Sequence, residues 1–391
     1  MGGESPGPGD TRPCKILFVF GWLVVGGEET ELRLLAKHID RSRFSLEVAA
    51  CFWKPEMPAQ ARKQLQAQGI PIDETPYSLS FDDTIDYLAA KMPQYDLIVA
   101  CQGVPDVYPA LERIEPHLRP PLIEHGGLVK EALAGPKHLT SRYIGVCASI
   151  REAAARQMHG REYHAIEIPS MVDLSEFDPS HRALVRTELG VMENVPLVGW
   201  IGRLDRKKRV EDFIHAAALV QRSLPGARFV VVGGPDAFMP EYAVALQALA
   251  TELGLSESLV FLGDRSDVPR LLAGLDVFVW LSRDEGMPHV ISEAGAACLP
   301  VVATRDNGSE QQITHGETGL FVPHESPVEV AGAIMRLLRD HALARRLGQS
   351  LRHKVEREYS TTTLVPRWEE LFEEVIREAR TEPKGALQST A

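Results

Sequence analysis

The stretch LDVFVWLSRDEGMPHVISEAGAACLPVVAT (275–304) passes from an apolar run into a loop and then into a helical pattern. The run 275–282 predicts a buried strand, and Pro288 suits the first turn of a helix whose apolar face begins at Val290. A buried strand followed by a loop and a helix is the repeating unit of a parallel α/β sheet. The helix start offers free backbone N–H groups and the positive end of the helix dipole. The loop 286–289 is therefore suited to hold an anion.

Two glutamates flank this loop. Glu285 lies in the loop and Glu293 on the helix, roughly 7 Å beyond Pro288 at about 1.5 Å per residue. Carboxylates repel phosphate but accept hydrogen bonds from sugar hydroxyls. The pattern therefore suits a ligand with a diphosphate in the middle and a sugar at each end, which describes a nucleotide-sugar. A surface helix that carries two solvated acids explains the same pair of residues.

A second loop, in PLVGWIGRLDRKKRVEDFIHAAALV (196–220), is basic. An apolar strand leads through Gly202 into five cations before an amphipathic helix begins. Side chains after a parallel strand lie at its carboxyl end, where open α/β sheets bind ligands, and Glu285 is expected at the same edge. Arg203 offers a fork of donors for diphosphate oxygens, and Lys208 offers a point charge. The alternative is a charged turn that water solvates.

These two loops stand in a longer order of motifs along the chain. The N-terminal half contributes GGEETELRLLAKHI (26–39), IEHGG (123–127), VCASI (146–150) and IPSMVDLSEFDP (168–179). The C-terminal half contributes GRLDRKKR (202–209), FVVVGGP (229–235), LVFLGDRSDVPRLLAGLDVFVWLS (259–282), EGMPHVISEAGAACLPVVATRDNGSE (285–310) and HGETGLFVP (315–323). From about residue 15 to residue 376, this order resembles the retaining nucleotide-sugar glycosyltransferases of family 4.

The resemblance implies a role for each charged residue of the donor site. Glu293 would accept hydrogen bonds from the ribose hydroxyls, and Glu285 from a hydroxyl of the transferred sugar. Arg203 and Lys208 would hold the diphosphate and stabilise it as it leaves. His125 corresponds to the active-site histidine of the family, which lies near the transferred sugar.

The resemblance also implies contacts from the main chain and the glycines. The N–H groups of Gly286, Met287 and His289 would reach the sugar and phosphate, whereas Pro288 has no N–H. The main chain at Asp264 and Arg265 would meet the base, and Gly202 would open the basic loop beside the donor. Gly26 and Gly27 would let the first loop of the N-terminal half approach the phosphate and the acceptor.

Three departures from the family pattern stand out. Ser170-Met171 replaces the usual Asn-Gly before Val172-Asp173, near the expected interdomain hinge. Cys298 stands where the family has glycine, at a helix end that favours a positive φ. Gly233-Gly234-Pro235 is tighter than the usual Gly-x-Gly-Pro. These departures leave the expected catalytic residues in place, but they concern the identity of the donor and whether the protein is fully active.

The chain of 391 residues is long enough for two domains. Strand-like runs alternate with helix-length segments in both halves, which predicts two parallel sheets with helices on both faces. The predicted strand runs are 15–20, 45–52, 96–101, 121–124, 143–148 and 164–169 in the first half, and 196–201, 227–233, 258–262, 275–281 and 299–303 in the second. The fold class is therefore α/β, and the resemblance implies two Rossmann-like domains that face each other across a cleft, the GT-B architecture. The expected divisions are a disordered tail 1–13, an N-terminal acceptor domain 14–185, a C-terminal nucleotide-sugar domain 186–360, a helix 361–380 and a loose tail 381–391.

Apolar residues in the predicted last helix form one stripe with i, i+3, i+4, i+7 and i+8 spacing: Trp368, Leu371, Phe372, Val375 and Ile376. A stripe of this width must pack against another element. The resemblance implies that this helix crosses back to the N-terminal domain.

Charge and cysteine content limit which partners and which cellular compartment are expected. A net charge of −12 without a pronounced basic tract argues against a nucleic-acid partner. The apolar run 16–25 is too short to span a bilayer and has no small-residue cleavage site, so it predicts the first strand. The protein is expected in the cytoplasm, with peripheral membrane contact through the N-terminal domain as a further expectation. Scattered cysteines without metal-ligand spacing fit a reducing compartment: Cys14, Cys51, Cys101, Cys147 and Cys298.

We therefore expect a retaining hexosyltransferase that moves a sugar from a nucleoside diphosphate to a hydroxyl of a glycan, lipid-linked or small acceptor. No His/Asp/Glu group has metal-ligand spacing, and no resident cofactor is expected beyond the nucleotide-sugar co-substrate. Attack from the face that the diphosphate leaves is favoured, and double displacement through a carboxylate stays open. The alternatives are a sugar-nucleotide epimerase or phosphorylase on the same fold, or a catalytically idle sugar-nucleotide-binding subunit.

Overall fold

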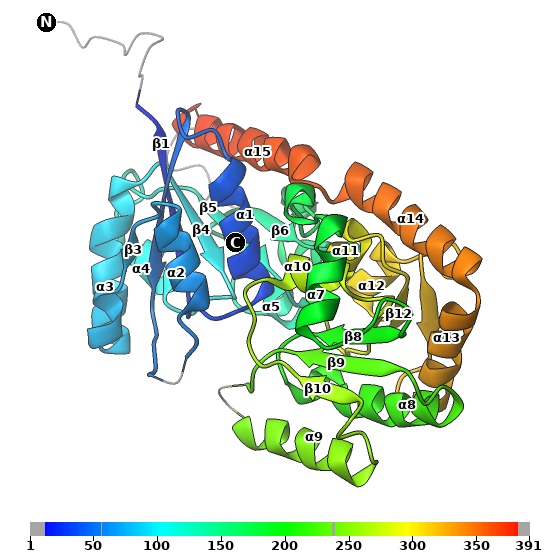
Figure 1. Cartoon of the computed structure of the whole chain (residues 1–391). Helices are drawn as coiled ribbons and strands as arrows, with labels where there is room; N and C mark the ends of the chain where they lie inside the picture. The colour runs from blue at the N-terminus through cyan, green and yellow to red at the C-terminus, as the bar shows by residue number, and fades with distance from the viewer. Residues whose placement is uncertain (1–11, 56, 237–238, 382–391) are drawn as a thin grey trace, which may run out of the picture.

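The computed structural model describes residues 12–55, 57–236 and 239–381. Within them, the chain forms two parallel β-sheets, one in each half, with helices on both faces of each sheet (Figure 1). This is the predicted α/β class with two Rossmann-like domains. No helix in the described ranges is both long and apolar enough to cross a membrane.

The first sheet has the strand order β3-β2-β1-β4-β5-β6-β7. Successive residues of β1 point to opposite faces, and both faces are apolar: Ile16, Phe18 and Phe20 pack on one side, and Leu17 and Val19 on the other. The strands are β1 Cys14–Phe20, β2 Phe44–Ala50, β3 Ile72–Asp73, β4 Leu97–Cys101, β5 Leu122–Gly126, β6 Thr140–Gly145 and β7 Ala165–Glu167. The α-helices are α1 Gly27–His38, α2 Gln60–Ala67, α3 Phe81–Lys91, α4 Val107–Arg113, α5 Val129–Leu133 and α6 Ala148–Gln157.

The second sheet has the order β10-β9-β8-β11-β12-β13. Its strands are β8 Leu197–Ile201, β9 Arg228–Val232, β10 Leu259–Phe261, β11 Val277–Trp280, β12 Val301–Thr304 and β13 Leu320–Val322. Its helices are α7 Arg182–Glu188, α8 Val210–Ser223, α9 Pro240–Glu252, α10 Val268–Ala273, α11 His289–Ala296, α12 Asn307–Gln312, α13 Pro327–Arg339 and α14 His341–Glu358.

The strand order reverses direction once in each sheet, between β1 and β4 and between β8 and β11. At such a reversal the loops that leave the two neighbouring strands diverge and open a crevice at the carboxyl edge of the sheet, where α/β folds bind ligands. The loop after β1 and the basic loop after β8 each begin at such a point.

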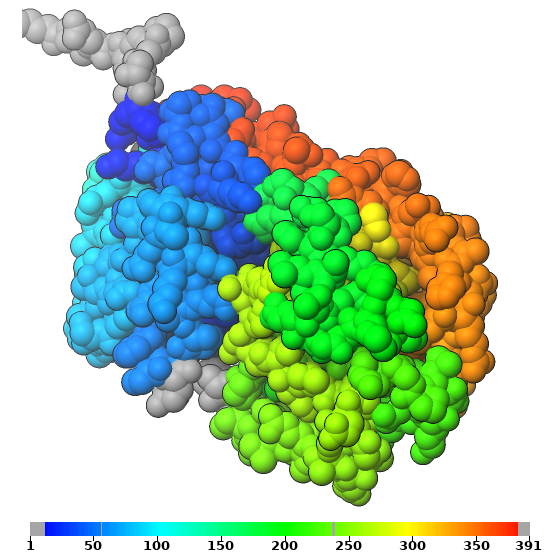
Figure 2. Space-filling view, viewed as in Figure 1, coloured from blue at the N-terminus to red at the C-terminus, as the bar shows by residue number. Residues whose placement is uncertain are grey.

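The last helix, α15 (Thr361–Thr381), returns to the first sheet, as the resemblance implied. Its apolar stripe joins the core that contains Phe18 and Phe44, and the Phe372 ring meets both phenylalanine rings edge-on at 6.4 and 5.8 Å. In the space-filling view, the red end of the chain lies along the upper edge beside the blue N-terminal segment, and the orange segment lies along the right-hand side of the second domain (Figure 2). A segment from the C-terminus thus completes the N-terminal core.

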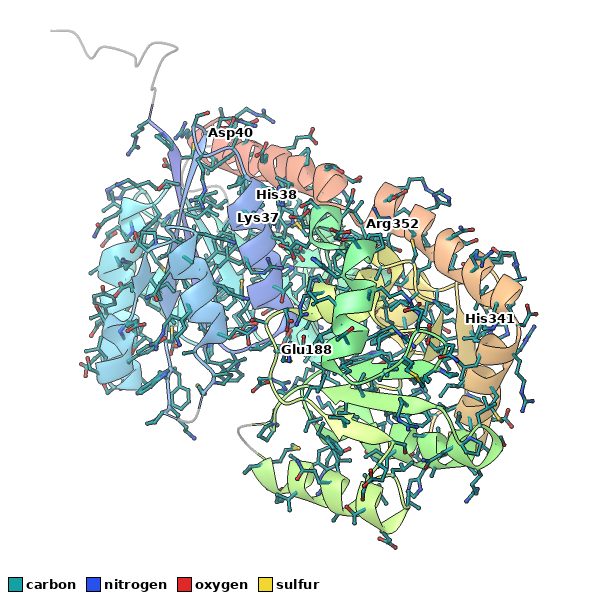
Figure 3. The ribbon with its side chains drawn as sticks, in the orientation of Figure 1. Lys37, His38, Asp40, Glu188, His341 and Arg352 are labelled. Atoms are coloured by element: carbon teal, nitrogen blue, oxygen red, sulfur yellow. The ribbon has the colours of Figure 1, made fainter. Side chains whose placement is uncertain are left out.

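The chain crosses between the halves twice, and the two crossings pair. Val172 and Ser360 form a parallel bridge, in which Val172 N donates to Tyr359 O at 2.8 Å and Thr361 N donates to Val172 O at 3.0 Å. Beside the bridge, Asp173 accepts from Lys37 and His38 at the end of α1, at 2.7 Å each (Figure 3). The crossing is therefore held by backbone pairing, by the Lys37–Asp173 ion pair and by the hydrogen bond between His38 and Asp173.

The structure differs from the expectations in a few places. The strand expected at 143–148 begins and ends three residues earlier, because Cys147 already serves as the N-cap of α6. Pro288 is the N-cap of α11 rather than a residue of its first turn. The short strands β3 and β13 were not among the predicted strand runs. The predictions for 1–13 and 381–391 concern tails that, apart from residues 12, 13 and 381, lie outside the described residues.

Candidate functional site

A cavity of about 1040 Å³ lies between the carboxyl edges of the two sheets. Its walls come from the loops after β1, β4 and β5 on one side and after β8 and β11 on the other. All of the predicted site residues except Asp264 line it. Residues as distant in the sequence as Gly26 and Glu293 therefore meet in one site.

Lys208 and Glu285 form the centre of the second-domain wall. Lys208 ends the short 3-10 helix Arg206–Lys208 after β8, and Glu285 lies in the loop after β11. Lys208 Nζ is 2.5 Å from Glu285 Oε1 and 5.0 Å from the centre of the Trp280 ring. The ion pair and the aromatic face fix the position of the ammonium group in the cavity.

Arg203 stands at the start of the same basic loop. Its Nε is 3.0 Å from Asp236 Oδ2, and its side chain is 42% exposed. The aspartate holds one edge of the guanidinium group while part of the side chain faces the cavity. This arrangement leaves a forked donor at the place where the sequence predicts a diphosphate.

Asp264 and Arg265 occupy different places. Asp264 Oδ1 accepts from Gly234 N at 2.7 Å, so this side chain supports the tight turn after β9 and does not line the cavity. Arg265 lines the cavity and pairs with Asp267 at 2.8 Å and with Glu188 at 3.0 Å (Glu188 in Figure 3). The main-chain contact of Asp264 and Arg265 with a base stays a prediction.

Glu293 is on α11, and its side chain reaches the cavity from below the loop 286–289. Burial raises the pKa of Glu293 to about 7, partly offset by Arg33 and increased by Glu176. Arg33 itself is held by Glu176 through two hydrogen bonds of 3.0 and 3.3 Å. The carboxyl group is therefore close to half-ionised at neutral pH.

Glycines let the two halves come into direct contact. A Cβ at Gly286 would overlap with the carbonyl oxygen of Gly127 across the cleft. At Gly27 a Cβ would lie 3.4 Å from His289 Cδ2, and at Gly202 it would come within 2.8 Å of the Trp280 ring. The glycines at 286 and 202 are therefore required by close packing at the site.

The two histidines of the site are buried and neutral. Burial lowers the pKa of His125 to about 4, with His289 as the second cause. Burial also lowers the pKa of His289 to about 4. The His125 ring packs edge-on against Trp368 at 5.3 Å, and His289 Nδ1 lies 3.2 Å from Met171 O. Neither imidazole carries a positive charge at neutral pH.

The Ser170-Met171 departure lies where the two halves meet. Ser170 N donates to Met287 Sδ at 3.3 Å, Ser170 Oγ donates to Met287 O at 3.4 Å, and Met171 N donates to Glu31 Oε2 at 3.0 Å. The segment therefore connects α1 of the first domain to the donor-side loop of the second. The serine hydroxyl supplies a contact across this junction.

The sequence analysis did not single out a group of acids on the first-domain wall. These residues are Glu28, Glu29 and Glu31 on α1 and Glu131 on α5, with Gln102 after β4 beside them. The signal was available in the three acids that follow Gly26-Gly27 within four positions. Glu131 and Gln102 have no comparable signal, because only the fold brings them to α1.

Within the described ranges, no group of three or more His, Cys, Asp or Glu residues is arranged to hold a metal ion. The independence from divalent metal stays a prediction that an activity measurement has to test.

Comparison with known proteins identifies the second domain. Residues 182–354 match the family of glycosyl transferases group 1. D-inositol 3-phosphate glycosyltransferase of Nocardia farcinica is 31% identical over 221 residues, which are 55% of this chain and 49% of that protein. N-acetyl-alpha-D-glucosaminyl L-malate synthase of Bacillus anthracis is 29% identical over 194 residues, or 50% of this chain and 49% of that protein. The matches thus span about half the length of these relatives.

The similarity in structure extends over nearly the whole chain. HepE of Anabaena, in a crystal structure with UDP and glucose, superposes with a TM-score of 0.80 at 22% identity and covers 92% of this chain and 100% of that one. The fold is therefore the two-domain GT-B architecture that the motif order implied.

Proposed function

We propose that this chain, which matches the family of glycosyl transferases group 1 over residues 182–354, moves a hexose from a nucleoside diphosphate to a hydroxyl acceptor. In this proposal the anomeric configuration is retained, and no divalent metal takes part. The observation that carries it is the arrangement of Arg203, Lys208 and the start of α11 around one cavity, with Glu285 and Glu293 on either side of that helix start.

The donor would lie along the second-domain wall. Glu293 would accept from the ribose hydroxyls, and Arg203 with the N-terminus of α11 would hold the diphosphate. Lys208 would stabilise the charge that gathers on the leaving oxygen as the glycosidic bond breaks. Glu285 would accept from a hydroxyl of the transferred hexose.

Attack from the face that the diphosphate leaves accounts for retention. The acceptor hydroxyl would give its proton to the departing diphosphate while its oxygen bonds to the anomeric carbon. The ion pair with Lys208 at 2.5 Å already engages Glu285, which argues against this carboxylate as a free nucleophile. A double displacement would require a covalent glycosyl intermediate on another carboxylate.

The relatives support this proposal by their names, two of which specify a glycosyltransferase and a glucosaminyl-malate synthase, and HepE was crystallised with UDP and glucose. An epimerase or an idle binding subunit on the same fold would bind the nucleotide-sugar without transferring the sugar to an acceptor, and a phosphorylase would exchange a glycosyl group with inorganic phosphate instead. Ser170 keeps contacts with Met287 across the junction between the domains, so the Ser170-Met171 departure gives no support to an idle subunit.

The proposal includes a cytoplasmic setting and peripheral contact with a membrane through the first domain. Exposed apolar side chains follow two neighbouring strands at the cavity edge: Trp22 and Val25 after β1, and Phe52 and Trp53 after β2. They would enter the headgroup region of a lipid surface. Flotation with anionic vesicles tests this contact, and loss of co-flotation in Trp53→Ser with Phe52→Ser supports it. Absence of wild-type binding removes it.

The function is tested with UDP- and GDP-hexoses in a thermal-shift screen, followed by NMR of the anomeric proton of the product in excess EDTA. An α-linked donor should give an α-linked product at an unchanged rate. An inverted linkage contradicts same-face attack. Strict dependence on added metal contradicts the assignment of charge stabilisation to Arg203, Lys208 and α11, and binding without transfer to any acceptor favours the idle subunit.

A further inference from the structure

The first-domain wall of the cavity contains a carboxylate without a partner. Glu28, in the first turn of α1, lines the cavity, and its side chain is 10% exposed. Among the residues that the structure describes, neither Oε1 nor Oε2 of Glu28 accepts a hydrogen bond of good geometry. The backbone N–H groups of Gln102 and Gly127 approach this carboxylate closely enough to lower its pKa, but burial outweighs them. Buried polar groups are normally hydrogen-bonded, so a buried carboxylate that faces a cavity without a partner is suited to bind a hydrogen-bond donor of a ligand.

Local structure does not explain Glu28. Acids in the first turn of a helix complement its dipole, but the neighbouring Glu29 also has direct partners, since its Oε1 accepts from Val24 N at 3.0 Å and from Gln102 Nε2 at 2.9 Å. Glu131 likewise accepts from Gly127 N and Leu128 N at 3.0 and 2.9 Å. Glu31 accepts from Met171 N through Oε2, and only its Oε1 lacks a partner in the described structure. Glu28 is therefore the glutamate of this group with both oxygens available to a ligand.

No nearby cation neutralises Glu28. Within the described residues, the basic group within 4 Å is His125, whose Nδ1 lies 3.8 Å from Glu28 Oε1. Burial keeps the pKa of His125 near 4, so this imidazole is neutral. Burial and the charges of Glu131 and Glu29 raise the pKa of Glu28 well above its ordinary value. His125 Nε2 also lacks a partner in the described structure and lines the same cavity.

The two walls of the cavity therefore differ in charge. The second-domain wall has five basic and five acidic side chains, and three of the basic ones, Arg203, Lys207 and Lys208, come from one loop and suit a diphosphate. The first-domain wall has five glutamates against two basic side chains, Arg33 and Lys130. In its ionised form Glu28 would repel a phosphate or carboxylate placed next to it. A ligand that donates hydrogen bonds to the carboxylate favours that ionised form, and one ammonium group or two hydroxyls can donate to both oxygens.

We propose that Glu28, with His125 beside it, forms the acceptor subsite. This subsite selects a sugar or cyclitol that presents hydroxyl or ammonium groups to Glu28. The selected acceptor carries no anionic group at the end that enters the cavity. This inference rests on the proposed transferase function and adds to it the chemical class of the acceptor. Glu28 is thus a specificity-determining residue, and the diphosphate stays on the opposite wall.

The test compares matched acceptors that differ by a phosphate. Glucosamine and glucosamine 6-phosphate form one pair, and myo-inositol and myo-inositol 1-phosphate form the other. Binding is measured by saturation-transfer NMR with the protein saturated with UDP or GDP, whichever binds in a separate titration. Wild type should bind at least one unphosphorylated member at least tenfold more tightly than its phosphorylated partner.

Two variants separate charge from shape. Glu28→Lys should reverse the preference within the bound pair, whereas Glu28→Gln should keep hydroxyl binding and weaken glucosamine at least threefold. Glu115→Lys makes the same charge change at an exposed site outside the cavity and should leave the preference unchanged. Circular dichroism establishes whether each variant is folded. If Glu28→Lys does not fold, the binding of the two acceptor pairs to wild type and to Glu28→Gln still tests the proposal.

Equal or tighter binding of the phosphorylated members to wild type overturns the proposal, as does an unchanged preference in folded Glu28→Lys. Failure of both unphosphorylated members to bind at 50 mM overturns it too. The nucleotide titration distinguishes the two levels of inference. If UDP and GDP both fail to bind, the transferase function itself is wrong, and if one binds while the acceptor pairs are not discriminated, only the acceptor class is wrong.

Discussion

At the scale of single residues, Glu293 links donor binding to pH. Ribose hydroxyls that donate to its carboxylate favour the charged form, so a bound donor lowers the pKa of Glu293 below the value of about 7 in the empty site. Below pH 7 the empty site must release a proton on binding, and we expect affinity to fall by up to about tenfold per pH unit. Above pH 7 affinity should be constant.

Calorimetry in two buffers of different ionisation enthalpy measures this proton release directly. Glu293→Gln should bind the donor more weakly and lose the pH dependence between pH 5.5 and 7. If the pH profile of wild type is flat, or if Glu293→Gln retains the slope, Glu293 does not bind the ribose.

Lys208 is expected to act mainly in the transition state. Its ammonium group meets a charge that grows as the diphosphate leaves, so Lys208→Ala should lower kcat by about 100-fold, near 3 kcal/mol, with a smaller change in donor KM. Steady-state kinetics at saturating acceptor checks this. Arg206→Ala is the matched control, since Arg206 lies in the same basic run, stacks on Tyr242 and does not line the cavity. A change confined to KM in Lys208→Ala would mean that the lysine binds the ground state.

At the scale of elements, the end of α11 is strained, because Cys298 takes a positive φ at a position where the resembled family has glycine. Cys298 has φ 58°, and Leu299 N donates to Ala294 O at 2.9 Å as in a helix closed by a left-handed residue. Cys298→Gly relieves about 1 kcal/mol of backbone strain but adds freedom to the unfolded chain, so a net gain of about 0.5 kcal/mol is expected. Cys298→Val should destabilise by about 1 kcal/mol. Urea denaturation followed by fluorescence measures both, and equal stabilities of Gly and Val variants would contradict the backbone explanation.

Elements with strong local patterns could be predicted from the sequence, and those defined by distant partners could not. The runs around β1, β8 and β11 are long and apolar because both of their faces are covered, so composition alone indicates them. Strand β3 has two residues, Ile72 and Asp73, and exists because it pairs with Val48 and Ala49. No local pattern specifies a strand of this length.

The same reasoning applies to the site. Glu285, Arg203 and Lys208 follow strands closely, and the carboxyl ends of parallel strands share an edge, so their meeting could be predicted. The distinction between Glu28 and Glu29 could not, because it depends on whether Val24 N and Gln102 Nε2 reach the carboxylate. Such bonds are set by the path of the loop after β1 and by a residue 73 positions away.

At the scale of the whole molecule, the last helix should control the stability of the first domain. Trp368 is 1% exposed and packs against Phe372 and His125. Trp368→Ala should cost about 3–5 kcal/mol and should weaken hydrogen-exchange protection in β1 far more than in β8. Glu370→Ala, at an exposed position of the same helix, should leave both unchanged. Equal loss of protection in β1 and β8 would show that the two domains unfold as one unit.

The return of α15 to the first sheet also decides how the protein can be divided. A gene fragment that stops near residue 180 lacks Trp368, Phe372 and Ile376 and so carries an open hydrophobic face where they belong. Joining residues 361–381 to the front of β1 through a designed linker would restore that face in a single shorter polypeptide. A fusion or recombinant that keeps residues 361–381 together with the first sheet retains a complete hydrophobic core. A chain that is divided between the first and the second sheet instead splits the core of the first domain between two fragments.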